Sequence, residues 1–432
     1  MPKSRPELPQ LEASYCGPLL EIESHLVENQ KEIETWFRQA WLETPAPFYA
    51  SVDLRNAGFK LAPVDTNLFP AGFNNLNHDF DALAIQAIQA AVEHVCPKAE
   101  GILLIPERHT RNIFYLESLA ALSHLIELAG FDIRIGSLEP ISEPVHFELP
   151  SGKVLTQHPI KRVGRRIVVD GFSPCAILLN NDLSGGTVAL LEGLEQTVIP
   201  PVSLGWWNRS KFRHFSLYTE LAESFCKLVD IDPWRITPLM TDCGEINFLK
   251  REGEDCLAKR VGELLEQITK KYRQYNIDRE PFVVIKADAG TYGMGVMIAR
   301  SAEEVIGLNR KQRTRMAASK EGLGIRRVLI QEGVYSFETV GQDQKVAEPV
   351  IYMIDHYVIG GFYRVHTKKG IDENLNAPGA QFVPLPFTES CITPNTDISP
   401  DADPNRLYTY GVVARLALLA AAREQAETKT ES

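Results

Sequence analysis

The spacing of apolar residues predicts helices and strands in alternation over the first half of the chain. Apolar positions recur at helical spacing within the first fifty residues, and again over 80–95 and 113–129. Short apolar runs at 101–106, 131–136 and 176–181 predict buried strands. Strands that alternate with helices of this length indicate a parallel α/β layer.

The pattern changes in the second half of the chain. A charge-rich helix is predicted over 256–275, followed by a strand that begins at Pro281. From Arg327 the sequence is typical of β structure, with strands at 328–334 and within 348–366 and a break at Gly360–Gly361. A proline-rich loop at 390–405 precedes a closing helix at 408–425. The segment 51–76 shows neither period and is predicted to be a long loop of the kind that often carries function.

Three segments are more polar than their surroundings. The first is the predicted loop 51–76, and the second is 106–112, directly after the strand 101–106, where the carboxyl end of a parallel strand favours ligand binding. The third is GWWNRSKFRH at 205–214. Each segment alone fits a solvated loop equally well. Together they predict a cationic pocket for a small carboxylate, because arginine pairs with carboxylates in a bidentate manner.

Charge and cysteine content narrow the classes of partner. The 432 residues carry a formal net charge of −11, which argues against a nucleic-acid partner and an anionic membrane surface. The sequence has no apolar run of transmembrane length and no signal-like N-terminus, so we expect a cytoplasmic protein. The seven cysteines are odd in number and form no C-x-x-C pair, which favours reduced thiols over a disulfide frame or a zinc site.

The stretch PFVVIKADAGTYGMGV places Lys286 at the end of a buried strand and three glycines directly after it. The dinucleotide fingerprint needs another glycine spacing, and the Walker motif needs its lysine after the glycines. A strand, a glycine loop and a second strand form a hairpin whose backbone N–H groups can cover a triphosphate. The alternative is a plain hairpin turn with a snorkelling lysine.

Further features follow in an order that suits a nucleotide site. The strand 328–334 can offer backbone groups to an adenine edge, and Glu338 is placed to reach a ribose. About thirty residues later, Arg364 precedes GIDENLNAPGA at 370–380, whose side-chain oxygens are of the kind that Mg²⁺ prefers. A cation beside them suits a transferring phosphoryl group.

This ordered set resembles the ATP-grasp superfamily, in particular its glutathione-synthetase branch. The motifs SVDLRNAGFKLAPVDTNLFPAGFNNL and KADAGTYGMGV resemble one narrow group, the proteobacterial (ferrooxidans-type) glutamate–cysteine ligase (GshA) family, and the likeness extends over about residues 15–425. It implies an α/β ATP-grasp fold with a helical and α/β substrate-binding domain at 1–240 and a nucleotide-binding part at 241–432. It also implies ATP-dependent synthesis of γ-glutamylcysteine from glutamate and cysteine through an acyl phosphate.

Other functions stay open at this point. A ligase of the same mechanism with another acid or amine is one alternative, and a non-catalytic nucleotide-binding protein is another. The expected small molecules are ATP, glutamate and cysteine, with Mg²⁺ accompanying ATP. The sequence leaves a homo-oligomer open.

The residue patterns and the resemblance together predict the site residues. For ATP they are Lys250, Lys286, Gly290, Thr291, Tyr292, Gly293, Met294, Gly295, Gln331, Glu332, Val334 and Glu338. For the substrates they are Arg55, Asn67, Asn74, Asn75, Arg108, His109, Arg111 and Arg364. Catalysis is expected from Arg364, Lys286 and Asn374. The late Glu-x-Asn metal pattern of ATP-grasp enzymes is absent after residue 380, so the metal ligands are expected among Glu332, Glu348, Asp355, Glu373, Asn374 and Asn376.

Overall fold

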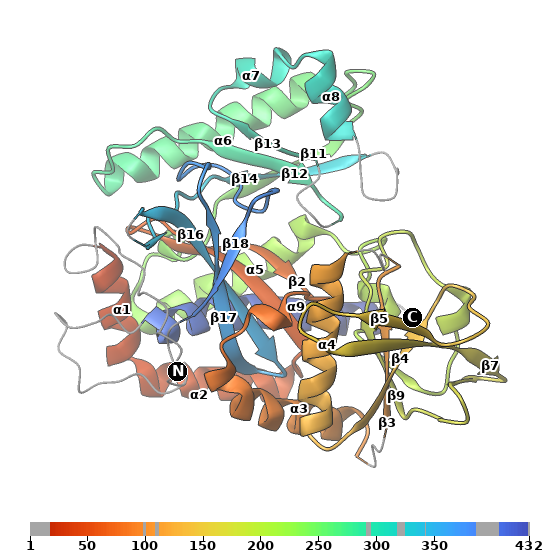
Figure 1. Cartoon of the computed structure of the whole chain (residues 1–432). Coiled ribbons are helices and arrows are strands. Elements are labelled where there is room, and N and C mark those ends of the chain that lie inside the picture. The colour runs from red at the N-terminus through yellow and green to blue at the C-terminus, as the bar shows by residue number, and fades with distance from the viewer. Residues whose placement is uncertain are drawn as a thin grey trace.

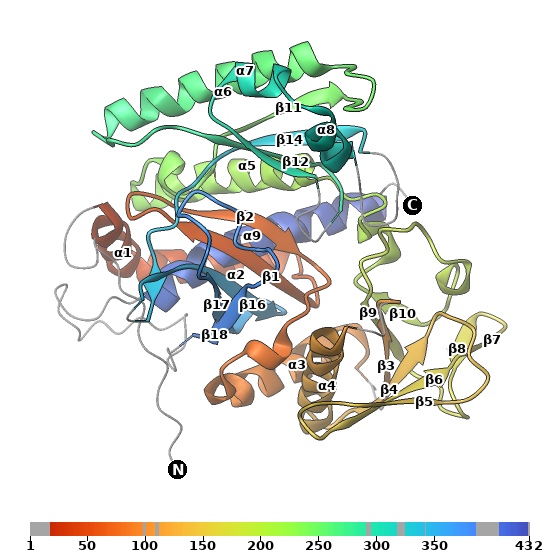
Figure 2. The same ribbon diagram turned by 45° about the horizontal axis from the view of Figure 1, so that its top comes forward.

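The computed structural model describes residues 18–97, 101–108, 112–290, 295–317, 325–341, 343–385 and 406–430. Within these ranges the chain is a mixed α/β protein with a central antiparallel sheet, a mostly parallel sheet beside it and a smaller sheet above it (Figures 1 and 2). The α/β class predicted from the sequence is confirmed. Every helix in the described ranges is too short or too polar to span a bilayer.

The central sheet joins strands from both ends of the chain. Its order is β18 (Gln381–Pro384), β17 (Tyr357–His366), β16 (Lys345–Ile354), β1 (Tyr49–Asn56) and β2 (Leu61–Asn67), with β15 (Thr339–Val340) paired to β16. All these pairs are antiparallel. One face is covered by α9 (Arg406–Thr430), which also packs against α5 (Lys211–Val229). The helices α1 (Pro18–Glu28) and α2 (Gln30–Glu43) complete this core.

The second sheet has the order β10 (Thr197–Ile199), β9 (Ala176–Asn180), β3 (Gly101–Pro106), β4 (Asp132–Ser137), β6 (Val154–Pro159) and β5 (Val145–Glu148). Only β5 runs antiparallel to its neighbour. The helices α3 (Asp81–Val95) and α4 (Ile113–Leu128) pack against it. The parallel layer is confirmed. The chain first extends from β3 toward β6 and then returns to β9 on the other side, so the topological switch point lies between β3 and β9.

The third sheet has the order β11 (Met240–Glu245), β14 (Arg327–Glu332), β12 (Val283–Ala287) and β13 (Val296–Ala299). Its core side is covered by α6 (Glu254–Gln274) with α7 (Ala302–Ile306) and α8 (Arg310–Ala317). The register pairs Lys286 with Val296, so the predicted strand, loop and strand do form a hairpin.

Shorter elements complete the described chain. The strands β7 (Lys161–Val163) and β8 (Arg166–Val168) form a separate hairpin. Single 3-10 turns are η1 (Phe73–Asn75), η2 (His78–Phe80), η3 (Ala189–Leu191), η4 (Val202–Leu204) and η5 (Pro233–Arg235).

Two of the predicted element assignments are wrong. The segment 51–76 is not a long loop, because it forms most of the β1–β2 hairpin. Polar and apolar residues do alternate over residues 51–55, as in a strand, but this stretch is short and the Asn, Gly and Pro residues that follow it indicate a loop. The break after β16 falls at Asp355–His356, whereas Gly360–Gly361 lies within β17 at a register shift. A Cβ on Gly361 would lie 2.3 Å from the Val350 carbonyl oxygen, so this glycine permits close strand approach.

The division expected at residue 240 does not follow the sheets. The strands β1 and β2 precede this residue, yet β1 pairs with β16, which follows it. One hydrophobic core likewise runs from Ile22 to Ala422. The N-terminal hairpin is therefore built into the same layer as the C-terminal strands.

Candidate active site

Two pockets meet where the three sheets approach one another. The first lies between the third sheet and the central sheet, and we call it the clamp compartment. The second lies between the central sheet and the carboxyl ends of the parallel strands, and we call it the switch-point compartment. Both are lined by Asp53, Asp65, Arg364 and Asn376, which we call the junction.

The clamp compartment combines apolar walls with a charged end. The hairpin β12–β13 supplies Val284, Val296 and Ile298 to its lining, and the segment after β14 supplies Val334. At the charged end lie Lys286 from β12 and Arg55 from β1, together with residues of the junction. An apolar slot that leads to cations is suited to a flat ring attached to an anionic group.

Lys286 is a half-buried lysine with few partners. Its Nζ donates hydrogen bonds to the Val64 carbonyl at 2.5 Å and to Gln331 Oε1 at 2.7 Å. Burial lowers the pKa of Lys286 to about 7, although the nearby carboxylate of Asp65 acts in the opposite direction. An anion that binds beside it would stabilise the charged form.

Two arginines flank one carboxylate at the charged end. Glu348 and Arg364 are cross-strand partners on β16 and β17, with Arg364 Nη1 at 3.4 Å from Glu348 Oε2 and 2.8 Å from Asp53 Oδ2. Arg55 bonds the other oxygen of Glu348 and donates to the Val334 carbonyl at 3.0 Å. Arg55, Glu348 and Arg364 are buried, whereas Asp53 is half-buried.

Arg364 keeps one donor for a ligand. Burial alone would lower its pKa, but Asp53 and Glu348 raise the pKa above the ordinary arginine value, so the group stays a cation. Its buried Nε has no hydrogen-bond partner among the described residues. A buried donor without a partner is costly, and an anion at the junction would satisfy it.

The cationic run 205–214 bonds to residues of β2 and lines neither compartment. Lys211 Nζ lies 2.5 Å from Asp65 Oδ1, and Arg209 donates to the Thr66 carbonyl at 2.7 Å and to Glu424 of α9 at 3.0 Å. Burial alone would raise the pKa of Asp65, but Lys211 and Lys286 bring it down to about 2. This segment therefore positions Asp65 and does not line the pocket predicted for it.

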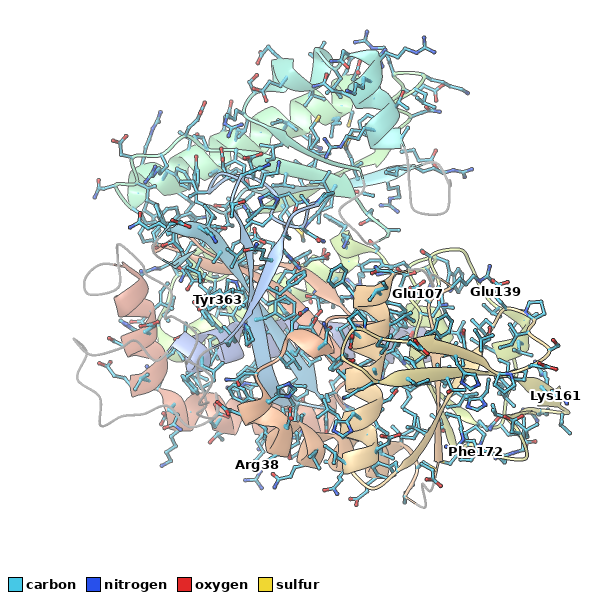
Figure 3. All side chains as sticks on the ribbon, viewed as in Figure 1. Arg38, Glu107, Glu139, Lys161, Phe172 and Tyr363 are labelled. Carbon is cyan, nitrogen blue, oxygen red and sulfur yellow. The ribbon has the colours of Figure 1, made fainter. Side chains whose placement is uncertain are left out.

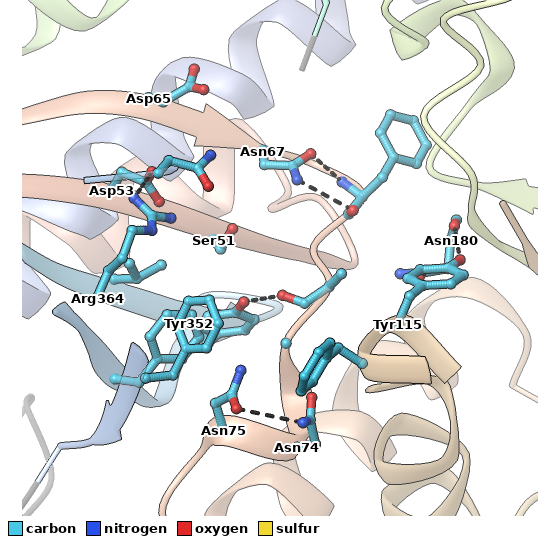
Figure 4. A pocket seen from close by; sticks show the side chains of 18 of the residues that line it. Ser51, Asp53, Asp65, Asn67, Asn74, Asn75, Tyr115, Asn180, Tyr352 and Arg364 are labelled. Atoms are coloured by element: carbon cyan, nitrogen blue, oxygen red, sulfur yellow. Dashed lines mark hydrogen bonds and ion pairs between the residues drawn. The ribbon is translucent and has the colours of Figure 1, made fainter. Parts of the chain in front are cut away.

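The switch-point compartment is lined by six asparagines and three hydroxyl side chains, together with four carboxylates, Arg364 and several apolar residues (Figure 4). Asn112, Tyr115 and Asn180 come from the carboxyl ends of β3 and β9 and from the start of α4. The β1–β2 hairpin and η1 contribute Ser51, Asn67, Asn74 and Asn75 to the lining. The cavity measures about 270 Å³, near the lower end of the ~300–1,000 Å³ typical of ligand pockets, and this suits amino-acid-sized molecules.

Hydrogen bonds fix the walls of this compartment. Tyr115 donates to the Asn180 carbonyl at 2.8 Å, and Asn180 Nδ2 donates to Tyr49 of β1 at 3.1 Å and to the Pro70 carbonyl at 2.8 Å. These bonds join the parallel sheet to the central sheet. Asn74 Oδ1 is buried without a hydrogen-bond partner in the described part of the chain, so a substrate donor would satisfy it.

Most of the predicted site residues that the structure describes are brought together. The residues that line one or both compartments are Arg55, Asn67, Asn74, Asn75, Lys286, Gln331, Glu332, Val334, Glu348, Arg364, Asn374 and Asn376. Six others lie outside the described residues, namely His109, Arg111, Thr291, Tyr292, Gly293 and Met294. Gly290 and Gly295 flank the glycine loop with positive φ angles of 102° and 63°.

Several predicted residues lie elsewhere. Lys250 is exposed in the turn before α6, and Arg108 pairs with Glu139 at 3.2 Å in a separate shallow pocket. Glu338 is fully buried. Its carboxylate accepts a hydrogen bond from the Tyr410 hydroxyl, and its backbone carbonyl accepts one from the Ala347 N–H. Asp355 lies at the far turn of the β16–β17 hairpin. These positions do not support the ATP-binding, substrate-binding and metal roles that the sequence predicted for them.

Two further carboxylates predicted as metal ligands are already engaged. Glu332 accepts from Lys60 Nζ at 2.6 Å, from Trp234 Nε1 at 3.1 Å and from the Leu239 N–H at 2.9 Å. Glu373 accepts from Lys369 at 2.8 Å, and this bond lowers the pKa of its carboxyl group. Neither carboxylate is oriented as a free ligand toward the junction.

The sequence analysis missed several polar residues of the site. Asp53 was not predicted as a site residue, nor were Ser51, Tyr115, Asn180 and Tyr352. In a strand, residues two apart share a face, so Ser51, Asp53 and Arg55 lie on one face of β1. Recognising that strand could have found Ser51 and Asp53, whereas the other three residues lie on elements that were predicted.

The fold and the junction define the class of protein. Buried arginines, a lysine of lowered pKa and a donor without a partner meet where an apolar slot joins an amide-lined pocket. Such a site belongs to an enzyme that brings two small anionic reactants together and stabilises charge between them.

The particular family is given by comparison with known proteins. The family model described as "Glutamate-cysteine ligase" (GshA) matches residues 23–425. The chain therefore belongs to the glutamate–cysteine ligase family and is an enzyme of the ligase class. No curated protein matches the chain.

A solved structure of high sequence identity agrees with this family. A crystal structure at 1.90 Å of a protein assigned as a gamma-glutamylcysteine synthetase, from Methylobacillus flagellatus KT, is 55% identical with a TM-score of 0.91. The match covers 98% of this chain and 99% of that one. A glutathione synthetase-like effector from Globodera pallida is 10% identical with a TM-score of 0.35, over 80% of this chain and 77% of that one. This likeness is too weak to indicate a shared fold or function.

Proposed function

We propose that the protein joins the γ-carboxylate of L-glutamate to the amine of L-cysteine, in a reaction driven by ATP that passes through an acyl phosphate. The family supplies the reaction class. The single observation that carries the assignment to this site is Arg364, a buried permanent cation at the junction whose Nε has no hydrogen-bond partner in the part of the chain that the structure describes.

ATP fits the clamp compartment in this proposal. The third sheet and the β16–β17 hairpin would act as the two halves of an ATP-grasp clamp around it. The apolar side chains of Val284, Ile298 and Val334 would contact the adenine. The triphosphate would extend toward Lys286 and Arg364, because these cations lie at the charged end.

The amino acids fit the switch-point compartment. Its amides offer both donors and acceptors, its carboxylates can bind the ammonium group of an amino acid, and Arg364 can bind a carboxylate. The reacting carboxylate would lie at the junction beside Arg364, and the remaining groups would reach toward Asn74 and Asn75. Placing both reactants at one junction supplies the proximity that the reaction needs.

The reaction proceeds in two steps, phosphoryl transfer and then attack by the amine. A γ-carboxylate oxygen of glutamate attacks the γ-phosphorus of ATP, the bond to the bridging oxygen breaks, and ADP leaves. The cysteine amine then attacks the acyl carbon, the carbon–oxygen bond to phosphate breaks, and the amine proton is released. Arg364 and Lys286 stabilise the negative charge that develops on the transferring group, and no protein nucleophile is required.

Mg²⁺ would accompany ATP at the junction. In the described residues no cluster of three or more His, Cys, Asp or Glu side chains forms a metal site of its own. The oxygen atoms of Asp53 and Asn376 at the junction are of the kind that Mg²⁺ binds together with substrate phosphates, whereas both oxygens of Glu348 already bond arginines. When bound, the ion neutralises phosphate charge.

Phosphate release from ATP tests this proposal. It is measured with glutamate alone, with cysteine alone and with both, and γ-glutamylcysteine is identified as the product. We expect stoichiometric phosphate and dipeptide only when both amino acids are present. Phosphate release that needs a different acid or amine would support the alternative ligase. ATP binding without any phosphate release would support a non-catalytic protein.

A further inference from the structure

Another cavity lies away from both compartments, at the turn of the β16–β17 hairpin that is opposite the junction. It measures about 910 Å³, within the ~300–1,000 Å³ typical of pockets for small molecules. Its walls come from α2, the linker to β1, the end of α3, the edge strand β10 and the turn at 355–356. None of its lining residues is shared with the clamp or switch-point compartment.

One wall of this cavity is formed by a row of aromatic rings and a guanidinium group that pack against one another. The rings of Phe37 and Trp41 are nearly parallel at 12° with their centres 6.3 Å apart, and Trp41 stacks on His356 at 29° and 6.1 Å. The Arg415 guanidinium lies 4.2 Å from the centre of the Phe37 ring and is held by Glu34 through bonds of 2.7 and 2.8 Å. Such a wall favours the face of a planar ligand.

Two buried polar atoms of the lining residues lack hydrogen bonds among the described residues. Asp355 is only 6% exposed, and its Oδ1 accepts from the His356 N–H at 2.8 Å, whereas its Oδ2 accepts no hydrogen bond. The ion-pair partner of Oδ2 is the exposed His94, at 3.4 Å. The Nε1 of Trp41 likewise has no acceptor. Unsatisfied polar atoms are costly, so this cavity has a reason to hold a ligand.

The charges around the cavity decide which ligand it takes. Glu34 and Arg415 neutralise each other, and Arg38 is exposed at the rim of the molecule, where water screens it (Figure 3). The buried acceptor is therefore Asp355. An edge of N–H donors satisfies it, and a positive charge on that edge adds to the attraction.

We propose that this cavity is a second ligand site, for a small planar aromatic molecule with an amidine or amino-heterocyclic edge. The edge donates N–H groups to Asp355, and the ring lies against the wall formed by Phe37, Trp41 and His356. This site is separate from the proposed reaction and does not depend on it.

Benzamidine and benzoate are the probes that test the site, because they share a ring and differ in the charge of the edge. Binding to the full chain is measured by calorimetry and ligand-observed NMR, with saturating ATP and glutamate. We expect saturable millimolar binding of benzamidine, with benzoate at least about tenfold weaker because a charge-assisted hydrogen bond is lost. ATP and glutamate should leave the affinity for benzamidine unchanged.

Variants locate the binding in the cavity. Asp355→Asn keeps the shape and the left-handed backbone, and it should weaken benzamidine binding at least about tenfold. The matched control is Asp230→Asn, since Asp230 is exposed with a φ of 52° against 50° for Asp355. Trp41→Leu removes the flat wall and should also weaken binding. Equal binding of benzoate, displacement by ATP or glutamate, or unchanged affinity in Asp355→Asn would each overturn the proposal.

Discussion

The two compartments of the active site differ in the polar groups that they add to the shared junction. The clamp compartment adds Lys286, Arg55 and Glu348, and each of these side chains is bonded to a partner on another strand. The switch-point compartment adds the carboxylates Glu107 and Asp182 and a set of amides and hydroxyls, some of which bond across two sheets. The two sets of groups suit different tasks. The cations of the clamp compartment act on charge that moves during reaction, whereas the amides of the switch-point compartment select a substrate by the geometry of its donors and acceptors.

The largest expected effect is at the junction. Arg364→Ala should lower turnover with glutamate and cysteine by about a hundredfold or more and weaken ATP binding much less, because the arginine acts on charge that develops in the transition state. Steady-state rates and nucleotide affinity measure the two effects. The control is Arg327→Ala, an exposed residue that lies 3.5 Å from Asp242.

Loss of Arg364 also leaves Asp53 without its bond, so folding must be checked separately. Arg364→Lys retains a cation and should recover the fold but only part of the turnover, because one ammonium group does not replace the forked guanidinium. Turnover close to wild type in a folded Arg364→Ala variant would show that this residue is structural only.

Lys286→Met should separate binding from folding in the clamp compartment. The variant loses a charge-assisted contact to phosphate, so ATP affinity should fall by about tenfold or more. Its melting temperature should change little, because removing a half-buried charge offsets the loss of the bonds to Val64 and Gln331. Calorimetry with ATP and a thermal melt are the measurements. An unchanged ATP affinity would contradict the phosphate assignment.

Asn74→Ala tests the switch-point compartment and should have a smaller effect. Its buried Oδ1 has no partner in the described chain, so a substrate donor is expected there. We expect KM for one amino acid to rise by about tenfold while KM for ATP stays unchanged. Asn29→Ala, at the exposed start of α2, is the control. An equal rise in KM for ATP would remove the distinction between the compartments.

The sequence predicted the regular parts of the fold. The helices α3 and α4 show a helical period, and the strands β3 and β9 are unbroken apolar runs that are buried at every position. The β1–β2 hairpin was missed because its alternation over residues 51–55 is short and the Asn, Gly and Pro residues that follow indicate a loop. Arg364 bonds Asp53 from 311 residues away, and no local pattern reports such a contact.

The same limit explains which site residues were predicted correctly. Lys286 is marked by its own surroundings, since a lysine in an apolar strand before glycines is unusual. Lys250 was chosen by its distance from Lys286 along the chain, which does not reveal that its turn faces solvent. Glu338 was placed near ATP, but Tyr410 of the closing helix covers it. Spacing identifies candidate residues, and the tertiary structure decides which of them face the pocket.

The last prediction concerns the proton on Lys286, and its effect is at most one proton per ATP. Burial lowers the pKa of this lysine to about 7, so above that pH the free enzyme holds it mostly neutral. A bound triphosphate favours the charged form and raises the pKa, and therefore ATP binding takes up a proton near pH 8 and weakens as the pH rises. The groups that face this lysine are Asp65, Lys211, Asp53 and Arg55. Because Asp65 has a pKa of about 2 it does not titrate there. Calorimetry in two buffers of different ionisation enthalpy measures the uptake, which Lys286→Met should abolish. An uptake that persists in this variant would place the titrating group elsewhere, and none in the wild type would mean that the lysine does not meet the phosphates.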